Sequence, residues 1–399
     1  MVLQILHIAD ILLWIVPAGS VAYVAFFAFV SLLRNRQQHS HSSASAFTES
    51  PTRFMVLFPA YHEDTVIRRS VSAFLRQDYS ADHYQLVVIS DHMQADTNEW
   101  LASQPLTLLQ PVFEKSSKAK ALQYAVERVE NGERREEREK WRIVILDADN
   151  IVESNFLSRL DCCCRQGHRA IQCHRTAKNA DNDIAALDGL SEEINNTIFR
   201  RAHNRVGLSS ALIGSGMCFS YQWFANHVDR LSTAVEDREL EALLLREKIH
   251  IHYAEDIRVM DEKVASKDNF QRQRLRWMTG QVQALFSMLP YLPTAIRTCN
   301  IDYIDKTLQQ ALLPRSILLI VLPFMALVLT LLHWPWSLKW WGLFLLLCLS
   351  LLIATPRQLR TRALFGKAFA LPSLAWRMTK NLAHIDKRDT TFHHTDHGK

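Results

Sequence analysis

The sequence predicts an α/β domain with a mostly parallel sheet and helices on both faces, held at a membrane by hydrophobic helices. Two observations support this fold class. From residue 53 onward, short apolar runs that fit strands alternate with segments of helical periodicity, a pattern typical of parallel sheets. One long apolar run precedes this region and two follow it, and a run of about 20 such residues can cross a bilayer.

The stretch from Ile143 to Asn150 is the centre of the predicted site. Its first four residues, Ile-Val-Ile-Leu, predict a buried strand, and Asp147 and Asp149 follow at the carboxyl end. Ligands of open α/β sheets bind at these strand ends, and two carboxylates beside a diphosphate are typical ligands of Mg²⁺ or Mn²⁺. Taken alone, Asp-Ala-Asp-Asn also fits a polar turn that caps a strand.

Two other predicted strands, over residues 54–58 and 86–89, also end in polar loops, the second of them at Asp91. The helix predicted before the Asp147 strand carries Lys118 and Lys120. Because the carboxyl ends of parallel strands meet at one edge of a sheet, three polar loops there indicate a binding site.

The second half of the domain is more helical. One long helix is predicted over residues 183–205, and another opens at Glu236-Asp237, where acidic charge also stabilises a helix dipole. Between them, Gly214-Ser215-Gly216 is weak evidence for phosphate binding and also fits a tight turn. A third, amphipathic helix over residues 271–285 carries three residues that alone fit a membrane-interface face: Gln273, Arg276 and Trp277.

The hydrophobic segments predict a topology. The first, over about residues 11–33, is followed by Arg34 and Arg36, which by the positive-inside rule places the amino terminus outside and the domain in the cytoplasm. The others cover residues 316–333 and 342–355, with tryptophans between them as in an interfacial belt. We therefore expect an integral protein of the plasma or inner membrane.

These segments divide the chain into six predicted parts. They are an N-terminal transmembrane helix (1–36), a linker (37–52), the α/β domain (53–289), an interfacial segment (290–314), a transmembrane hairpin (315–356), and a cytoplasmic interfacial helix with a C-terminal tail (357–399).

Composition excludes other classes of protein. The 399 residues carry a formal net charge of only +5, and no basic stretch is interleaved with aromatic residues, so no nucleic-acid partner is expected. The seven cysteines lack the spacing of a zinc site, and their odd number fits packing residues in a reducing compartment.

The polar positions form an ordered set, namely Asp91, Asp147 and Asp149, Glu236-Asp237, and Gln273-x-x-Arg276-Trp277. With this set the chain resembles the membrane-embedded family 2 glycosyltransferases, in the branch of the cellulose, hyaluronan and poly-N-acetylglucosamine synthases, over about residues 54–280. The resemblance implies a GT-A fold, a UDP-sugar donor, a divalent ion and transfer with inversion. The implied partners are a lipid bilayer and a polysaccharide or lipid acceptor.

The resemblance also implies a role for each matching residue. Asp237 is the expected catalytic base, which takes the proton of the acceptor hydroxyl. Asp147 and Asp149 are expected to hold the donor diphosphate and the Mg²⁺ or Mn²⁺ ion, with Asp149 a direct ligand. Further donor contacts are expected from Asp91 at the nucleotide base, Lys120, Gln273 and Arg276. Acceptor contacts are expected from Trp277, Gly214, Ser215, Gly216 and Glu236.

The chain departs from the family pattern in three places. His62 stands where many relatives have asparagine, and the terminal Phe392, Thr395 and His397 match the gating loop of cellulose synthases only in part and also fit a His-rich tail. Synthases that secrete their polymer use more membrane helices than the three predicted here. A polymer-exporting enzyme of this kind would assemble with itself or with an export subunit.

The expected function is elongation of a β-linked polysaccharide at the cytoplasmic membrane face. The alternative is transfer of one sugar to a membrane lipid, as in ceramide glucosyltransferases, and the small number of helices favours it. A binding protein with an inactive site is disfavoured by the intact Asp149, Asp237 and Arg276.

Overall fold

The computed structural model describes residues 2–33, 50–130, 140–178, 183–233, 235–263 and 267–361. Several sequence expectations lie outside these ranges: the basic residues Arg34 and Arg36, most of the linker 37–52, the interfacial helix after residue 362, and the gating-loop residues Phe392, Thr395 and His397. The orientation in the membrane and the gating loop therefore stay predictions.

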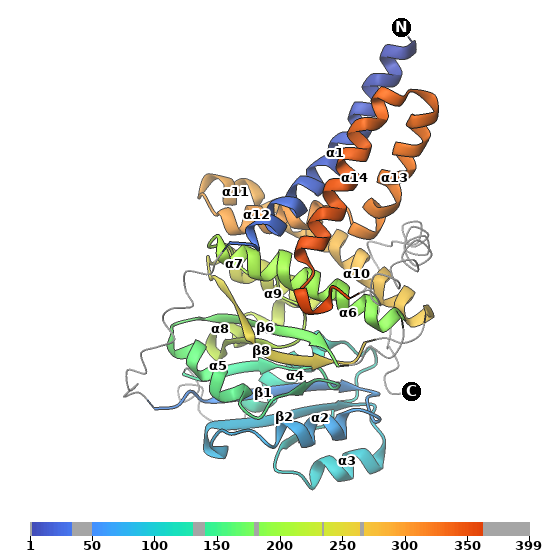
Figure 1. Cartoon of the computed structure of the whole chain (residues 1–399). Helices are drawn as coiled ribbons and strands as arrows, with labels where there is room; N and C mark the ends of the chain where they lie inside the picture. The colour runs from blue at the N-terminus through green and yellow to red at the C-terminus, as the bar shows by residue number, and fades with distance from the viewer. Residues whose placement is uncertain are drawn as a thin grey trace.

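An eight-stranded sheet forms the centre of the α/β domain, in the order β3-β2-β1-β4-β7-β6-β8-β5 (Figure 1). The pairs β1–β2, β1–β4, β2–β3 and β6–β8 are parallel, whereas β4–β7, β6–β7 and β5–β8 are antiparallel. The sheet is thus mixed but mostly parallel, which confirms the predicted fold class. The strands are β1 (Phe54–Tyr61), β2 (Tyr84–Asp91), β3 (Thr107–Leu109), β4 (Arg142–Ile145), β5 (Ile151–Val152), β6 (Ala170–Ala177), β7 (Met217–Ser220) and β8 (Ile251–Asp261).

Helices cover both faces of this sheet. Alternate residues of a strand face opposite sides, so Met55 and Leu57 pack into one core while Val56 and Phe58 pack into the other. The first core is closed by α4 (Lys118–Glu130), α8 (Tyr221–Ala225) and α9 (Glu236–Arg246), and the second by α2 (Ile67–Phe74), α3 (Ala95–Ala102) and α5 (Phe156–Arg165). Short turns of 3₁₀ helix are η2 (Ala81–His83), η5 (Val228–Arg230), η6 (Leu289–Tyr291) and η7 (Arg357–Leu359).

The carboxyl ends of β1, β2 and β4 meet at one edge of the sheet, as predicted. β1 continues to Tyr61, beyond the predicted end at residue 58, because β2 beside it continues to Asp91 and the two residues are paired. Strand pairing thus brings the loops after β1 and β2 next to the turn that follows β4.

The helix predicted over residues 183–205 lies between the sheet and the helix bundle (Figure 1). It consists of α6 (Asp183–Asn195), a π-helical segment η4 (Asn196–Ala202) and α7 (His203–Arg205). Ile198 and Ala202 pack into the same buried cluster as Val21 and Val24 of the first helix of the chain. The α/β domain and the bundle therefore share a packed interface.

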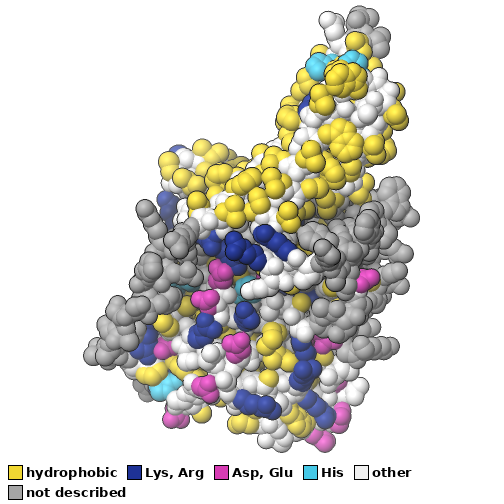
Figure 2. All heavy atoms as spheres, viewed as in Figure 1, with side chains coloured by type: hydrophobic (Ala, Val, Ile, Leu, Met, Phe, Trp, Pro, Cys, Tyr) yellow, Lys and Arg dark blue, Asp and Glu magenta, His cyan; other side chains and the backbone are white. Residues whose placement is uncertain are grey.

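The bundle contains α1 (Val2–Val30), α13 (Arg315–Leu332) and α14 (Trp334–Ala354). Within the described ranges these three helices are long and apolar enough to cross a membrane. Their hydrophobic surface gives way to a mixed charged surface over the α/β domain (Figure 2). α1 begins well before the predicted residue 11, and Asp10 within it pairs with Lys339 at 2.5 Å and accepts a hydrogen bond from Trp340 Nε1 at 2.9 Å.

The segment between the domain and the bundle contains α10 (Lys267–Met288), α11 (Leu292–Arg297) and α12 (Ile301–Ala311). α12 packs into the first core through the fully buried Tyr303, while Ile296 and Ile301 are exposed. The predicted interfacial segment 290–314 is thus partly domain core.

Candidate active site

A cavity of about 310 Å³ opens at the carboxyl edge of β1, β2 and β4, and we call it the active-site pocket. Nine of the predicted site residues line it: Asp91, Asp147, Asp149, Gly214, Glu236, Asp237, Gln273, Arg276 and Trp277. Three others, Lys120, Ser215 and Gly216, do not line it. Residues separated by up to 186 positions in the sequence thus converge on one site.

The turn after β4 is held in place by Asn150. Its Oδ1 accepts a hydrogen bond from the backbone N–H of Asp147 at 2.9 Å, and its Nδ2 donates to Asp149 Oδ1 at 3.1 Å. The backbone N–H of Glu262, just after β8, donates to Asp149 Oδ2 at 2.8 Å. These contacts re-aim the chain so that both acids reach one pocket, although alternate residues of an extended strand would face opposite sides.

Lys118 is the lysine of α4 that reaches the pocket. Its ammonium donates to Asp147 Oδ1 and, at 2.5 Å, to the carbonyl of Gly214, and it lies 3.5 Å from Glu236 Oε1. Burial lowers the pKa of Lys118, but the nearby acids Asp147 and Glu236 outweigh it, so the pKa is raised and the side chain stays charged.

Lys120, which the sequence analysis placed at the donor, lies elsewhere. It is exposed, and its ammonium donates to the backbone carbonyl of Lys115 at 2.7 Å. Residues two apart on a helix do not share a face. Lys118 is in phase with the buried Leu122 and Ala125, a signal that would have selected it over Lys120.

Glu236 and Asp237 form the first turn of α9, opposite Gly214. Gly214 has a φ of +81°, and a Cβ placed on it would lie 3.7 Å from Asp237 Oδ2 and from Glu236 Oε1. Asp237 Oδ1 accepts a hydrogen bond from the backbone N–H of Arg238 at 2.8 Å. Burial raises the pKa of Glu236 to about 7, although Lys118 lowers it, so this carboxyl changes charge near neutral pH.

Ser215 and Gly216 do not line the pocket but pack against residues next to it. Ser215 is fully buried and donates a hydrogen bond to Asn150 Oδ1, and Gly216 packs so closely that a Cβ would lie 3.0 Å from Val259 Cγ2. In the Gly-Ser-Gly sequence, therefore, only Gly214 faces the pocket.

Asp91 lies at the far end of the pocket and is 3% exposed. Its Oδ1 is 2.6 Å from His92 Nδ1. His62, which departs from the family pattern, has a φ of +55° in the loop after β1, and its backbone N–H donates to the carbonyl of Asp91 at 3.4 Å.

α10 supplies the opposite wall. Gln273, Arg276 and Trp277 line the pocket, and the guanidinium of Arg274 lies 4.4 Å from the centre of the Trp277 ring. Arg274 also pairs with Asp188 of α6. The indole is thereby fixed between a cation and the pocket.

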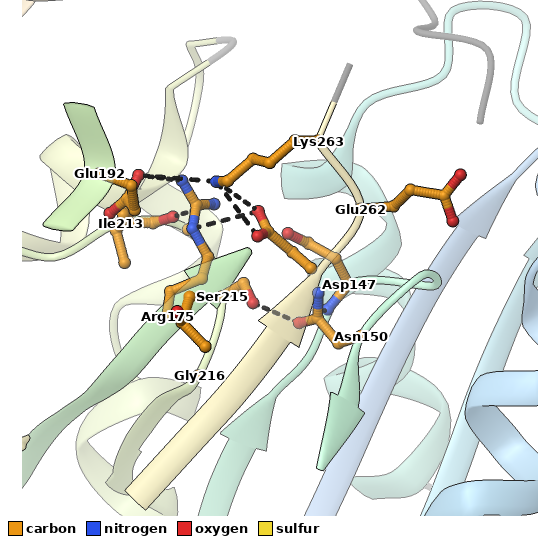
Figure 3. A network of polar contacts seen from close by, with 12 residues as sticks. Asp147, Asn150, Arg175, Glu192, Ile213, Ser215, Gly216, Glu262 and Lys263 are labelled. Carbon is orange, nitrogen blue, oxygen red and sulfur yellow. Dashed lines mark hydrogen bonds and ion pairs between the residues drawn. The ribbon is translucent and has the colours of Figure 1, made fainter. Parts of the chain in front are cut away.

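A buried charge network that sequence reasoning missed forms the floor beside Asp147 and Asp149 (Figure 3). Arg175 Nη2 lies 3.1 Å from Glu192 Oε2, and Lys263 Nζ lies 3.1 Å from Asp261 Oδ1. Burial alone raises the pKa of Glu192, but Arg175, Arg200 and Lys263 lower it to about 2. Glu192 therefore stays ionised, and Arg175, Arg200 and Lys263 line the pocket beside it.

The donor groups fit a divalent ion that shares its ligands with a diphosphate. Asp147 and Asp149 offer hard oxygen atoms from one turn, and Mg²⁺ and Mn²⁺ use one or two carboxylates and complete their shell with phosphate and water. Within the described ranges, no group of three or more His, Cys, Asp or Glu side chains could hold a metal by itself.

Solved structures align with the fold at low identity. PcManGT, a mannosyltransferase from Pyrobaculum calidifontis in complex with GDP-Man and Mn²⁺, aligns with a TM-score of 0.49 and 15% identity, over 92% of this chain and 98% of that one. S. aureus TarS 1–349 in complex with UDP aligns with a TM-score of 0.37 and 14% identity, over 56% of this chain. The chain spans 64% of that TarS structure, which is less than two thirds.

The comparison with sequence families is more specific. No curated protein matches the chain. The model of a family described as "Glycosyltransferase like family 2" matches residues 51–280, which is more than half of the chain and includes every predicted site residue that lines the pocket. The chain therefore belongs to glycosyltransferase-like family 2.

Proposed function

We propose that this protein transfers a sugar from a UDP-sugar to a hydroxyl group of an acceptor at the membrane, with inversion at the anomeric carbon. The convergence of three groups of residues in one pocket carries this proposal: the acids at the strand ends, Glu236-Asp237, and the Gln-x-x-Arg-Trp face of α10.

In this proposal Asp237 is the base. It takes the proton of the acceptor hydroxyl as the oxygen attacks the anomeric carbon, and the bond from that carbon to the diphosphate breaks. A positioned general base contributes about 10² to 10⁴ in rate. A single displacement with inversion is what the resemblance implies, because its motif set contains one base and no second nucleophile.

The departing nucleoside diphosphate gains negative charge. Arg276 and Lys118 are placed to stabilise that charge, because a permanent cation in a partly buried site interacts more strongly than in water. A Mg²⁺ or Mn²⁺ ion held by Asp147 and Asp149 would supply further charge stabilisation. In this proposal Asp91 contacts the nucleotide base, and Trp277 contacts the acceptor sugar or head group.

The acceptor class decides between the two expected functions. A polymer acceptor is what the resemblance to polysaccharide synthases implies. An apolar cavity that adjoins the pocket favours the lipid alternative, since a glycan gains nothing from hydrophobic walls.

The first experiment supplies labelled UDP-glucose or UDP-N-acetylglucosamine with Mn²⁺ to the full chain in lipid nanodiscs and separates products by length and solvent extraction. One discrete, extractable product is expected, and a water-soluble ladder would instead establish a polymerase. Asp237→Asn is expected to keep UDP binding and to lose at least about 100-fold in transfer. Transfer at the wild-type rate in this variant would remove Asp237 as the base.

A further inference from the structure

A second cavity, of about 350 Å³, lies between the α/β domain and the helix bundle, and we call it the interface cavity. Its walls come from α1, α6, α10, α13 and α14, and apolar side chains such as Leu190, Ile194, Met278 and Leu319 line most of it. α1, α13 and α14 are the helices that are apolar enough to cross a membrane, so hydrocarbon would surround this end of the molecule. The interface cavity is therefore placed to take up a lipid chain.

The interface cavity adjoins the active-site pocket. Five residues line both: Asn195, Arg200, Leu212, Arg238 and Trp277. Arg238 follows the proposed base Asp237 directly, and Trp277 follows Arg276 on α10. A ligand with its chain in the interface cavity can thus present its other end to Asp237 without leaving the protein.

The polar end of the interface cavity is strongly basic. Four arginines line it, Arg200, Arg238, Arg274 and Arg315, against one acid, Glu241. Two of them are neutralised, because Arg200 pairs with Glu192 at 3.2 Å and Arg274 pairs with Asp188.

Among the described residues, the side chains of the other two arginines donate hydrogen bonds to uncharged groups, although the charge of Arg238 also interacts with Glu241. Arg315 Nη2 donates to Asn195 Oδ1 at 2.7 Å, and Arg238 donates to Gln310 Oε1. In the described part of the chain, Arg315 Nη1 is buried and has no hydrogen-bond partner. A buried guanidinium N–H without an acceptor is unfavourable, and a phosphate oxygen is the ligand atom that suits it best.

We propose that the interface cavity binds the acceptor, and that this acceptor is a phospholipid whose head group bears a hydroxyl. The chain fills the apolar part, the phosphate accepts hydrogen bonds from Arg315 and Arg238, and the hydroxyl lies beside Trp277 and Asp237. This inference rests on the proposed function, since it names the substrate of the same site.

The step balances without a further reactant. The head-group oxygen forms a bond to the anomeric carbon, and the bond from that carbon to the diphosphate oxygen breaks. Asp237 takes the hydroxyl proton, and the nucleoside diphosphate leaves with the electron pair. The phosphate of the lipid remains unchanged.

A binding experiment tests the cavity separately from transfer. The full chain in detergent receives fluorescent phosphatidylglycerol, which has both a phosphate and head-group hydroxyls, or fluorescent diacylglycerol, which has a hydroxyl and no phosphate. Leu319→Trp adds bulk inside the interface cavity and is expected to weaken phosphatidylglycerol binding at least tenfold. The matched control is Leu327→Trp on the same helix, where the side chain is 56% exposed, and wild-type binding is expected there.

Arg315→Gln tests the head group. Loss of a charge-assisted contact is expected to weaken phosphatidylglycerol binding about tenfold and to leave diacylglycerol binding unchanged. Equal binding in the Leu319→Trp and Leu327→Trp variants would overturn the chain site. If the wild type binds phosphatidylglycerol and diacylglycerol with equal affinity, and Arg315→Gln changes neither affinity, the assignment of an anionic head group would be overturned.

Two further readouts separate this inference from the proposed function. UDP binding by calorimetry tests the donor site alone, and we expect it in the wild type and in all three variants. If UDP does not bind, the proposed function fails whatever the lipid result. If phosphatidylglycerol binds as expected and UDP-sugars are consumed, but no label enters any phospholipid, the cavity is a lipid site and the acceptor assignment is wrong.

Discussion

Replacing Gly280 by alanine tests how the two helices of the active site are held together. Gly280 lies on α10, close to Val235, the residue before Glu236-Asp237. A Cβ on Gly280 would lie 2.4 Å from Val235 Cγ1, 2.9 Å from Cγ2 and 3.1 Å from Cβ. Rotating the valine leaves its Cβ in place, so α10 must move away from the start of α9.

The magnitude follows from two opposing effects. Overpacking a buried contact costs about 1–3 kcal/mol, whereas replacing glycine within a helix gains about 0.5–1 kcal/mol. We expect a net loss in the free energy of unfolding of about 1 kcal/mol, with ~2.5 kcal/mol as the upper bound. Because a misplacement of 1 Å can cost about 10² in rate, a shift of a few tenths of an ångström is expected to slow transfer about tenfold.

The assay is a double-mutant cycle with Val235→Ala, read by sugar transfer and by thermal unfolding in detergent. In the Val235→Ala background most of the cost of Gly280→Ala is expected to disappear, because Cγ1 and Cγ2 are gone and only the contact with the Cβ of residue 235, at 3.1 Å, remains. Gly342→Ala on α14 is the matched control, since a Cβ there has nothing within 4 Å. Wild-type activity and stability in Gly280→Ala, or an equal loss in both backgrounds, would refute the reasoning.

Three other changes test the site. Burial raises the pKa of Glu236 from 4.5 to about 7, so the folded protein holds a proton that the unfolded chain releases. The free energy of unfolding is therefore expected to fall by on the order of 3 kcal/mol as the pH rises from 4.5 to about 7. Thermal unfolding of Glu236→Gln should not show this pH dependence. Asp149→Ala is expected to abolish the gain in UDP affinity on adding Mn²⁺, and calorimetry with the same gain as the wild type would contradict the ligand assignment. Glu192→Ala leaves buried cations without their anion and is expected to lower the free energy of unfolding by about 3–5 kcal/mol. Glu255→Ala breaks a partly exposed ion pair with Arg201 and is expected to lower it by less than ~1 kcal/mol. Equal unfolding midpoints for the two variants would count against the network.

Much of the fold could be predicted because its signals are local. The apolar runs of β1, β2 and β4 identify strands, and strand polarity alone places Asp91 and the two acids after β4 at one edge. The antiparallel entry of β7 between β4 and β6 could not be predicted in this way. A short strand such as Met217–Ser220, with three apolar residues and a serine, carries no sign of its direction, which depends on pairing with distant strands.

The charged floor of the pocket shows what sequence patterns leave out. Arg175 is a basic residue within a strand, and Glu192 is an acid within a helix, and each alone reads as a solvent-facing position. The packing of α6 against β6 brings Arg175 Nη2 to 3.1 Å from Glu192 Oε2 and buries both side chains in one network. Ion pairs between distant segments have no periodic signature, so no single window of sequence reveals them.

α10 explains why one helix could be read in two ways. Gln273 and Arg276 face the active-site pocket, Arg274 and Met278 face the interface cavity, and Gly280 faces α9. With 3.6 residues per turn, these positions divide into two faces: Gln273, Arg276 and Gly280 lie on one, and Arg274 and Met278 lie on the other. The result resembles the pattern of a helix that lies on a membrane surface, although Gln273 and Arg276 line the active-site pocket. Under the proposed function the donor and acceptor contacts of α10 belong to different residues of one helix, so we expect substitutions on the cavity face to alter the choice of acceptor while the residues proposed to hold the donor keep their positions.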